Sequence, residues 1–268
     1  MDITGLIWAV GLIGGIGLFV GLFLGIASSK LKVEVDPREE EVTKALPGNN
    51  CGGCGYPGCS GLAASIIKGD AAVDSCPVGG APVAAKIAEI MGVEVSDKVE
   101  MVAFVKCAGD CDRTQKLYEY TGTMDCRMAA FIPAGGNKSC SSGCLGFGSC
   151  VAACPFGAIA IQNGIAVVDK DKCKACGKCV AVCPKALIEL IPKTASYAVQ
   201  CSSKDKGPAT MKACTTGCIG CGICVKNCPE QAVTVSEFHA HIDQEKCSGC
   251  GTCAEKCPKK VIISQQPV

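Results

Sequence analysis

The sequence is poor in the residues that most enzyme and nucleic-acid-binding sites depend on. It has only two histidines, aromatic residues make up 4% of the chain, and the net charge is +1. Binding a nucleic acid takes clustered positive charge and aromatic rings on which bases stack, so we expect no nucleic-acid partner. No phosphate-binding glycine loop follows an expected strand, and no Ser/His/Asp set or isolated acid–base residue stands out. The sequence therefore predicts no catalytic residue on this chain.

What the sequence has in excess is cysteine, with 25 among 268 residues. Such a content is usual in disulfide scaffolds, but those are short, secreted and carry dispersed cysteines. Here the cysteines cluster at gaps of two and three residues, and their number is odd. Zinc sites would need histidine as well, and His239 and His241 alternate with Ala240 in an expected strand, as surface residues do. Thiolates bound to iron in a reducing compartment fit the pattern better.

The most informative stretch is Cys218-x2-Cys221-x2-Cys224-x3-Cys228-Pro229, which recurs as Cys247-x2-Cys250-x2-Cys253-x3-Cys257-Pro258. This spacing is the bacterial ferredoxin signature. Three thiolates on one tight loop hold one [4Fe–4S] cluster, while the fourth ligates the neighbouring cluster. The glycines between the ligands let the backbone approach the cluster closely, and each proline ends its loop. Two paired runs favour [4Fe–4S] clusters over a zinc site.

The region from Cys140 to Cys183 repeats 74 residues later, so that Cys140 corresponds to Cys214 and Cys183 to Cys257. Two tandem ferredoxin-like modules are therefore expected. The position that corresponds to Cys221 is Phe147, so the first motif lacks a ligand. Cys140 is the substitute that the sequence offers, and Cys214 is then surplus.

Ligand exchange within each module predicts four clusters. Their ligands would be Cys140, Cys144, Cys150 and Cys183; Cys154, Cys173, Cys176 and Cys179; Cys218, Cys221, Cys224 and Cys257; and Cys228, Cys247, Cys250 and Cys253. A fifth set with a different spacing, C-x2-C-x4-C-x16-C, comes earlier and consists of Cys51, Cys54, Cys59 and Cys76. A zinc ribbon is the alternative for this set.

Five cysteines remain outside these sets: Cys107, Cys111, Cys126, Cys201 and Cys214. Our hypothesis is a sixth cluster held by Cys107, Cys111, Cys126 and either Cys201 or Cys214. The alternative is that all five are structural thiols, which are common in protein interiors. The sequence thus predicts five to six [4Fe–4S] clusters.

Residues 3 to 27 form an uncharged stretch longer than the roughly 20 residues that span a bilayer. Lys30 and Lys32 follow it, so the positive-inside rule predicts a single-pass anchor in the cell membrane with the rest of the chain in the cytoplasm. A cleaved signal peptide is the alternative, although it would need a basic start and a shorter apolar core. Glycines four residues apart, such as Gly17 and Gly21, permit close helix packing with a membrane partner, but glycine is also common in membrane helices.

The expected fold class is α+β. A membrane helix (1–29) and a linker (30–36) come first. A small helical [4Fe–4S] domain (37–95), with helices from Asp36-Pro37, over Ser60 to Lys68 and over Ala81 to Met91, comes next. A connecting region (96–139) with a strand over Val99 to Lys106, ferredoxin-like module 1 (140–192), a linker containing Cys201 (193–213) and ferredoxin-like module 2 (214–268) complete the chain.

An N-terminal anchor, the run Cys51-Gly-Gly-Cys54-Gly-Tyr-Pro-Gly-Cys59 with a later Cys76-Pro77, and ferredoxin repeats together resemble RnfB, the iron–sulfur subunit of the Rnf complex. That complex is a membrane-bound, ion-translocating ferredoxin:NAD oxidoreductase. The second ferredoxin module and Cys107, Cys111 and Cys126 are similar to the longer form found in anaerobes. The resemblance implies an electron-transfer subunit that takes electrons from reduced soluble ferredoxin and passes them to flavin and iron–sulfur partners in the membrane.

Two other functions compete with this one. The iron–sulfur subunit of another membrane redox enzyme, such as a hydrogenase or a formate dehydrogenase, also uses paired ferredoxin motifs, but the set from Cys51 to Cys76 is not expected there. A sensor or cluster-storage protein would hold labile clusters that do not react with ferredoxin.

Overall fold

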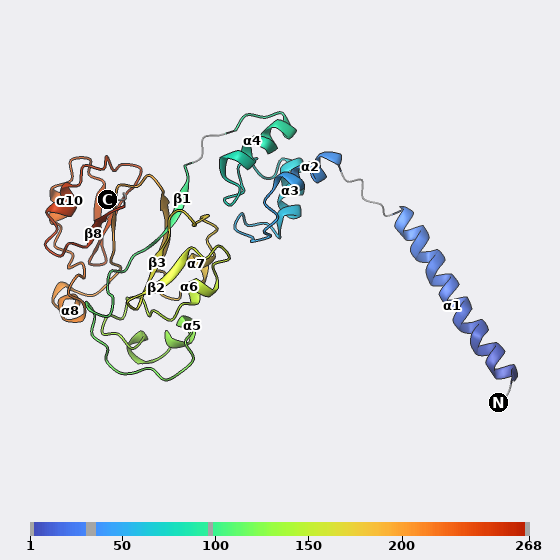
Figure 1. Cartoon of the computed structure of the whole chain (residues 1–268), viewed down its shortest axis with the longest axis horizontal. Helices are drawn as coiled ribbons and strands as arrows, with labels where there is room; N and C mark the ends of the chain where they lie inside the picture. Colours follow the sequence, from blue (N-terminus) through green and yellow to red (C-terminus); the bar gives the residue numbers. More distant parts are fainter. Residues whose placement is uncertain (1–2, 31–35, 96–98, 266–268) are drawn as a thin grey trace.

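A computed structural model describes residues 3–30, 36–95 and 99–265 (Figure 1). Helices dominate its first third, and short strands alternate with short helices after that. The elements are α1 (Ile3–Lys30), α2 (Pro37–Ala45), α3 (Cys59–Lys68), α4 (Gly80–Met91), β1 (Met101–Val105), α5 (Cys126–Ala129), the 3-10 helix η1 (Pro133–Gly135), α6 (Ser149–Ala152), β2 (Ile159–Gln162), β3 (Ile165–Val168), α7 (Lys178–Val182), β4 (Ile188–Pro192), β5 (Tyr197–Val199), α8 (Gly207–Ala213), α9 (Ile223–Lys226), β6 (Val233–Ser236), β7 (His239–Ile242), α10 (Thr252–Glu255) and β8 (Ile262–Ser264).

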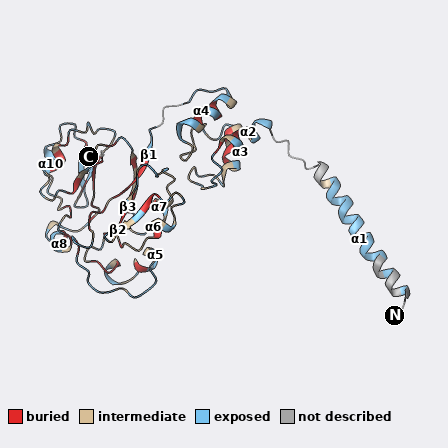
Figure 2. Cartoon of the chain, viewed as in Figure 1, coloured by how far each residue is buried: buried red, intermediate tan, exposed pale blue. Residues whose placement is uncertain are grey.

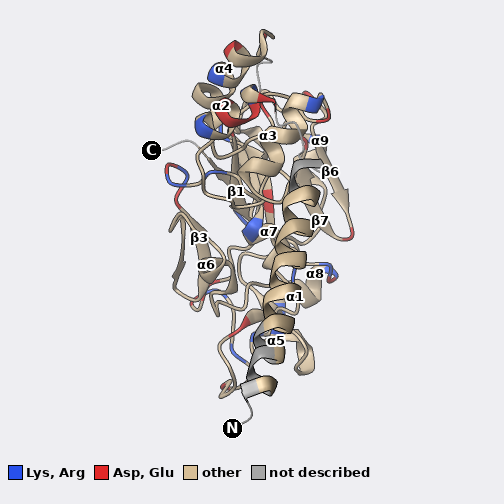
Figure 3. Cartoon of the chain, turned by 90° about the vertical axis from the view of Figure 1, so that its right-hand side faces the viewer, with Lys and Arg blue, Asp and Glu red and all other residues tan. Residues whose placement is uncertain are grey.

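The helix α1 coincides with the uncharged N-terminal stretch, and the part of its ribbon that Figure 3 does not draw in grey carries no acidic or basic colour. Several of its described apolar side chains are exposed, among them Trp8, Phe19 and Phe23. Within the part of the chain that the structure describes, no helix reaches the length and apolarity needed to cross a membrane. Part of the predicted span (the side chains of residues 3, 5–7, 9 and 10) and residues 31–35 of the predicted linker lie outside the described residues.

Helices α2, α3 and α4 pack around one apolar core, and their positions confirm the three helices predicted for this region. Helix α2 begins where Asp36 caps it, because the carboxylate accepts a 2.9 Å hydrogen bond from the backbone N–H of Arg38. Helix α3 ends at Gly69, whose left-handed backbone (φ 82°) closes the last turn. The core side chains Val42, Leu62, Ile66 and Ile87 are almost completely buried.

Each ferredoxin-like module consists of two antiparallel strand pairs and two short helices. In module 1, β1 pairs with β4 and β2 pairs with β3. In module 2, β5 pairs with β8 and β6 pairs with β7. The mixture of helices and strands agrees with the expected α+β class. Strands β1 and β5 precede the predicted module boundaries at 140 and 214, yet each closes its own module by pairing with that module's last strand.

Cysteine side chains take part in the cores of both modules. Cys150 and Cys179 are buried with Ile159 and Ile188 in module 1. In module 2, Cys224 and Cys253 are buried with Val233, Ile242, Val261 and Ile262. Figure 2 shows the buried residues along the paired strands. The loops that carry the cysteines are thus part of the hydrophobic cores of the modules.

The two modules meet at the ends of their first strands. The N–H of Ala108 donates a 3.0 Å hydrogen bond to the carbonyl of Gln200, and the Ser202 hydroxyl donates one of 3.3 Å to the carbonyl of Lys106. Lys106 follows β1 as Gln200 follows β5, so the two contacts are structurally equivalent in the two modules. The Ser139 hydroxyl likewise donates a 2.8 Å hydrogen bond to the carbonyl of Ala213, its counterpart 74 residues later.

The helical domain contacts module 1 through its own cysteine loop. A side chain at Gly53 would place its first carbon 2.8 Å from the carbonyl oxygen of Cys176 and 3.0 Å from its Cα atom. Contacts this short leave room only for glycine. The loop between Cys51 and Cys54 therefore lies directly against the loop that carries Cys176.

Candidate iron–sulfur centres

The first cysteine set lies at the edge of the helical domain. Cys54, Cys59 and Cys76 pack against the core formed by α2, α3 and α4, and Cys51 precedes Cys54 on the same loop. Cys59 opens α3, and its N–H donates a 2.8 Å hydrogen bond to the side-chain oxygen of Asn50, which fixes the loop to the helix. Burial raises the pKa of the Cys76 thiol; the backbone amides of Gly79 and Val78 oppose this, while the charges of Cys54 and Cys59 add to it.

The first set of module 1 differs from the predicted one. Cys126, Cys144, Cys150 and Cys183 line one cavity, and burial raises the pKa of Cys150 to about 12, with the other three sulfurs adding to the shift. Cys126 is held there from the start of α5, where its N–H donates a 2.7 Å hydrogen bond to the Ser149 hydroxyl. The structure therefore places Cys126 where the sequence predicted Cys140. Phe147, in place of a ligand, stacks on Tyr120 with ring centroids 5.1 Å apart.

The structure brings the second predicted set of module 1 together. Cys154, Cys173, Cys176 and Cys179 line one cavity under β1, with Ala103 and Leu190 as apolar walls. The N–H of Ala103 donates to the Cys173 sulfur over 3.4 Å. Burial raises the pKa of Cys179 to about 11, and the charges of Cys173 and Cys176 add to the shift.

Module 2 brings both of its predicted sets together. Cys218, Cys221, Cys224 and Cys257 line one cavity. Cys228, Cys247 and Cys253 pack in the same core, and the charges of Cys247, Cys228 and Cys250 all act on Cys253, whose pKa burial raises. In both motifs a left-handed glycine starts the helix that carries the third ligand: Gly222 (φ 71°) before α9 and Gly251 (φ 77°) before α10. Directly after these turns, the backbone N–H of Val225 acts on the Cys224 sulfur and that of Thr252 on the Cys250 sulfur.

These sets fit [4Fe–4S] clusters by their donor chemistry. Each contains four sulfurs, and several of the sulfurs accept hydrogen bonds from backbone N–H groups, as thiolates of iron–sulfur clusters do. Examples are the bonds from Ala103 to Cys173 and from Ala232 to Cys228, at 3.4 and 3.3 Å. Among the described residues, no group of three or more His, Cys, Asp or Glu side chains is arranged to hold a single metal ion.

The five cysteines outside these predicted sets are distributed differently from the sixth cluster that we expected. Cys111 is exposed, and Cys126 lines the cavity of the first set of module 1. Cys107, Cys201 and Cys214 line a separate cavity. Cys140, whose predicted place is taken by Cys126, lines the same cavity. The sequence does contain a signal that relates Cys107 to Cys201, because Val105-Lys106-Cys107 and Val199-Gln200-Cys201 stand at equivalent places at the ends of β1 and β5. The interval between the two is longer than the 74-residue repeat, so the repeat alone does not align them.

Comparisons with known proteins agree with this geometry. Residues 46–78 match a family described as a putative Fe-S cluster, and residues 137–191, 172–233 and 217–261 match families described as 4Fe-4S dicluster domains. Together with the five cysteine sets, these matches define a multi-cluster iron–sulfur protein of the electron-transfer class.

The relatives make this more specific. The chain is 49% identical to the subunit designated B in the Na(+)-translocating ferredoxin:NAD(+) oxidoreductase complex of Acetobacterium woodii, over 88% of this chain and 71% of that protein. It is 43% identical to the subunit of the same designation in the ion-translocating oxidoreductase complex of Methanosarcina acetivorans, over 90% of this chain and 91% of that protein. A relative from Clostridium ljungdahlii, named as part of a proton-translocating complex, is 42% identical over 85% of this chain and 81% of its own. The chain belongs to the RnfB family of ion-translocating, Rnf-type ferredoxin:NAD oxidoreductases.

Proposed function

We propose that this chain is the iron–sulfur subunit that accepts electrons from reduced soluble ferredoxin and relays them to flavin and iron–sulfur partners of a membrane-bound ferredoxin:NAD+ oxidoreductase. The observation that carries the proposal is the presence of five four-cysteine sets in one chain, combined with membership of the RnfB family. A bound [4Fe–4S] cluster supplies reversible one-electron chemistry.

The residues of the chain have three tasks in this function. The cysteines hold the clusters, in the sets Cys51, Cys54, Cys59 and Cys76; Cys126, Cys144, Cys150 and Cys183; Cys154, Cys173, Cys176 and Cys179; Cys218, Cys221, Cys224 and Cys257; and Cys228, Cys247, Cys250 and Cys253. The apolar side chains packed around the buried ligands, such as Cys150, Cys179 and Cys224, limit the contact of these sulfurs with water, which tunes the reduction potential. The backbone amides that face the sulfurs stabilise negative charge there.

The contact at Gly53 supports a direct electronic connection between the helical domain and module 1. It brings the loop of Cys51 and Cys54 against the backbone of Cys176, so two ligand loops touch without a side chain between them. We propose that the helical domain and the Cys154 set of module 1 are neighbours in the relay for this reason.

A membrane anchor over residues 3–27 belongs to the same proposal. Its support is the length of the uncharged stretch, the exposure of its described apolar side chains, and Lys30 and Lys32 behind it. Other subunits of the complex and the membrane are then partners of this chain, and the iron–sulfur part lies in the cytoplasm.

The test is anaerobic mixing of the full-length chain with reduced soluble ferredoxin, followed by freeze-quench EPR. We expect the signals of reduced [4Fe–4S] clusters to appear in the chain as the ferredoxin signal declines. A sensor or storage protein would show clusters that dithionite reduces while ferredoxin does not, and that result would overturn the proposal. Cys54→Ala serves as the control for domain independence, because it should remove the signal of the helical domain and keep those of the modules.

A further inference from the structure

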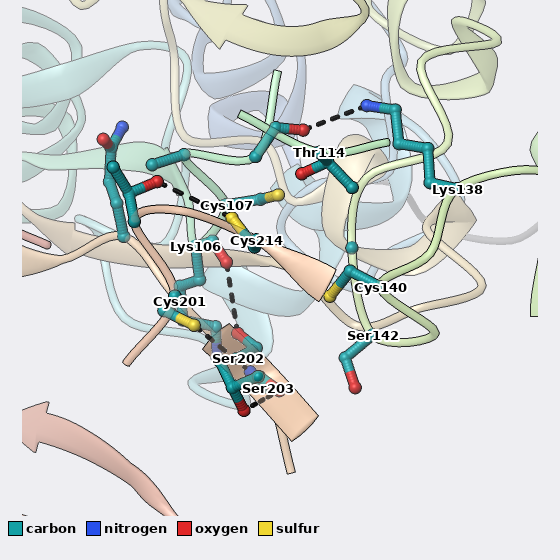
Figure 4. A pocket seen from close by; sticks show the side chains of 17 residues that line it. Lys106, Cys107, Thr114, Lys138, Cys140, Ser142, Cys201, Ser202, Ser203 and Cys214 are labelled. Carbon is teal, nitrogen blue, oxygen red and sulfur yellow. Dashed lines mark hydrogen bonds between the residues drawn. The ribbon is translucent and has the colours of Figure 1, made fainter. Parts of the chain in front are cut away.

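We propose that Cys107, Cys140, Cys201 and Cys214 hold a sixth [4Fe–4S] cluster at the junction of the two ferredoxin-like modules. This inference rests on the proposed function and specifies where the relay crosses from one module to the other. All four residues line one cavity (Figure 4). Cys107, Cys201 and Cys214 are buried, and Cys140 is half-buried.

The four cysteines obey the internal symmetry of the chain. Cys107 follows β1 by two residues, as Cys201 follows β5, and Cys140 corresponds to Cys214 in the 74-residue repeat. Each module therefore contributes one equivalent pair. Four chance thiols would not be expected to form two pairs related by the same symmetry that relates the modules.

The sulfurs of this set are hydrogen-bonded as cluster ligands are. The N–H of Cys144 donates to the Cys107 sulfur over 3.3 Å, and the N–H of Cys218, its repeat counterpart, donates to the Cys201 sulfur over 3.2 Å. A further N–H, that of Ser203, donates to Cys201 over 3.4 Å. Amides that point at sulfur favour its thiolate form, which is the form that binds iron.

Two polar side chains in the cavity wall indicate an anionic occupant. The Thr114 hydroxyl is buried and has no hydrogen-bond partner among the described residues, although it lines the cavity. An unpartnered buried hydroxyl is unfavourable unless a bound group accepts from it. Lys138 is also buried there, held by hydrogen bonds from its ammonium to the carbonyls of Gly109 and Gly164 at 3.0 and 2.8 Å. Its positive charge would offset part of the negative charge of four thiolates with iron.

The site lies between two others. Cys144, which donates to Cys107, belongs to the first set of module 1, and Cys218, which donates to Cys201, belongs to the first set of module 2. A cluster at this position connects the clusters of the two modules into one continuous series. The series then runs from the helical domain through the two sets of module 1, the junction, and the two sets of module 2.

The experiment is a count of iron, acid-labile sulfide and zinc per full-length chain after anaerobic purification. We expect about 24 irons in the unmodified chain, and about 20 in each of the variants Cys140→Ala and Cys201→Ala, which remove one ligand from each module. Mössbauer spectra should assign all of this iron to [4Fe–4S] clusters. The matched control is Cys111→Ala, which removes an exposed thiol and should keep about 24 irons.

The outcomes separate this inference from the proposed function. About 20 irons in the unmodified chain, or one zinc with 20 irons, would overturn the sixth cluster while leaving the five-cluster relay intact. A loss of four irons in Cys111→Ala would overturn this ligand set. If the two ligand variants fail to fold, the iron count of the unmodified chain still decides between about 20 and about 24. Fewer than about four irons would contradict the relay as a whole.

Discussion

At the scale of single residues, the surroundings of each cysteine decide what it can bind. Cys126 and Cys140 show this, because both lie outside the compact ferredoxin motifs and only tertiary contacts assign them. Cys140 is closer in sequence to the incomplete motif around Phe147, yet Cys126 is the residue that reaches its cavity. The hydrogen bond from Cys126 to Ser149 ties α5 to α6 across this cavity. A contact between residues 23 positions apart is invisible to motif spacing.

Lys138 is the residue whose charge should matter most to the junction site. Replacing it in Lys138→Met removes a buried positive charge from the cavity lined by Cys107, Cys140, Cys201 and Cys214. Because a cation stabilises the reduced, more negative cluster, the midpoint potential of one cluster should fall by roughly 60–120 mV, which corresponds to about 1.4–2.8 kcal/mol. An EPR-monitored redox titration measures this shift.

The matched control is Lys86→Met on the exposed face of α4, which should leave every midpoint potential unchanged. Equal potentials in Lys138→Met and the unmodified chain would show that this ammonium does not face a cluster.

At the scale of elements, local sequence patterns predicted the parts whose interactions are local. The three helices of the helical domain were predicted near their observed bounds, because capping residues and apolar periodicity act within a few residues. The predicted strand over Val99 to Lys106 was also found, as β1. Its partner was not predicted: β1 pairs with β4, far along the chain, and this pairing moves the strand from a connecting region into module 1.

The contact of two ligand loops at Gly53 gives a prediction at this scale. In Gly53→Val the added side chain would collide with the backbone of Cys176, so the helical domain must move away from module 1. Because electron transfer rates depend on separation, we expect exchange between the helical domain and module 1 to slow by at least tenfold while iron content stays the same. Freeze-quench EPR after a pulse of reductant would measure this rate.

Ala85→Val is a suitable control, since Ala85 is exposed on α4 in the same domain and makes no such approach. A normal rate in Gly53→Val would mean that this contact does not carry the connection. Loss of iron in this variant would instead show that Gly53 is needed for the cluster of its own loop.

At the scale of the whole molecule, the two kinds of domain depend on their clusters to different degrees. The helical domain has a core of large apolar side chains. Among them, Leu62, Ile66 and Ile87 are almost completely buried. The modules have short strands, and cysteines are several of the buried residues in their cores. Folding of such cores is coupled to metal binding, because the ligands come together only in the folded state and the free energy of metal binding therefore contributes to folding.

Removing iron should therefore affect the domains unequally. After mild oxidation and chelation, we expect amides of β2 and β6 to lose most of their protection from hydrogen exchange, while amides of α3 and α4 keep more of theirs. Hydrogen-exchange mass spectrometry provides the measurement. Reconstitution with iron and sulfide should restore the protection. Strands that stay protected in the iron-free chain would show that the modules fold on apolar contacts alone.

The paired arrangement of Cys107 with Cys140 and of Cys201 with Cys214 has a consequence for how such a chain can be assembled. One module by itself carries half a ligand set, and two separate copies could complete it only by meeting across a twofold axis, at a rate and affinity set by their concentration. In this chain β4 ends at Pro192 and β5 begins at Tyr197, so a linker of four residues connects the two modules. The shared site thereby becomes intramolecular, and its occupancy depends on iron and sulfide supply and no longer on how many copies the cell contains.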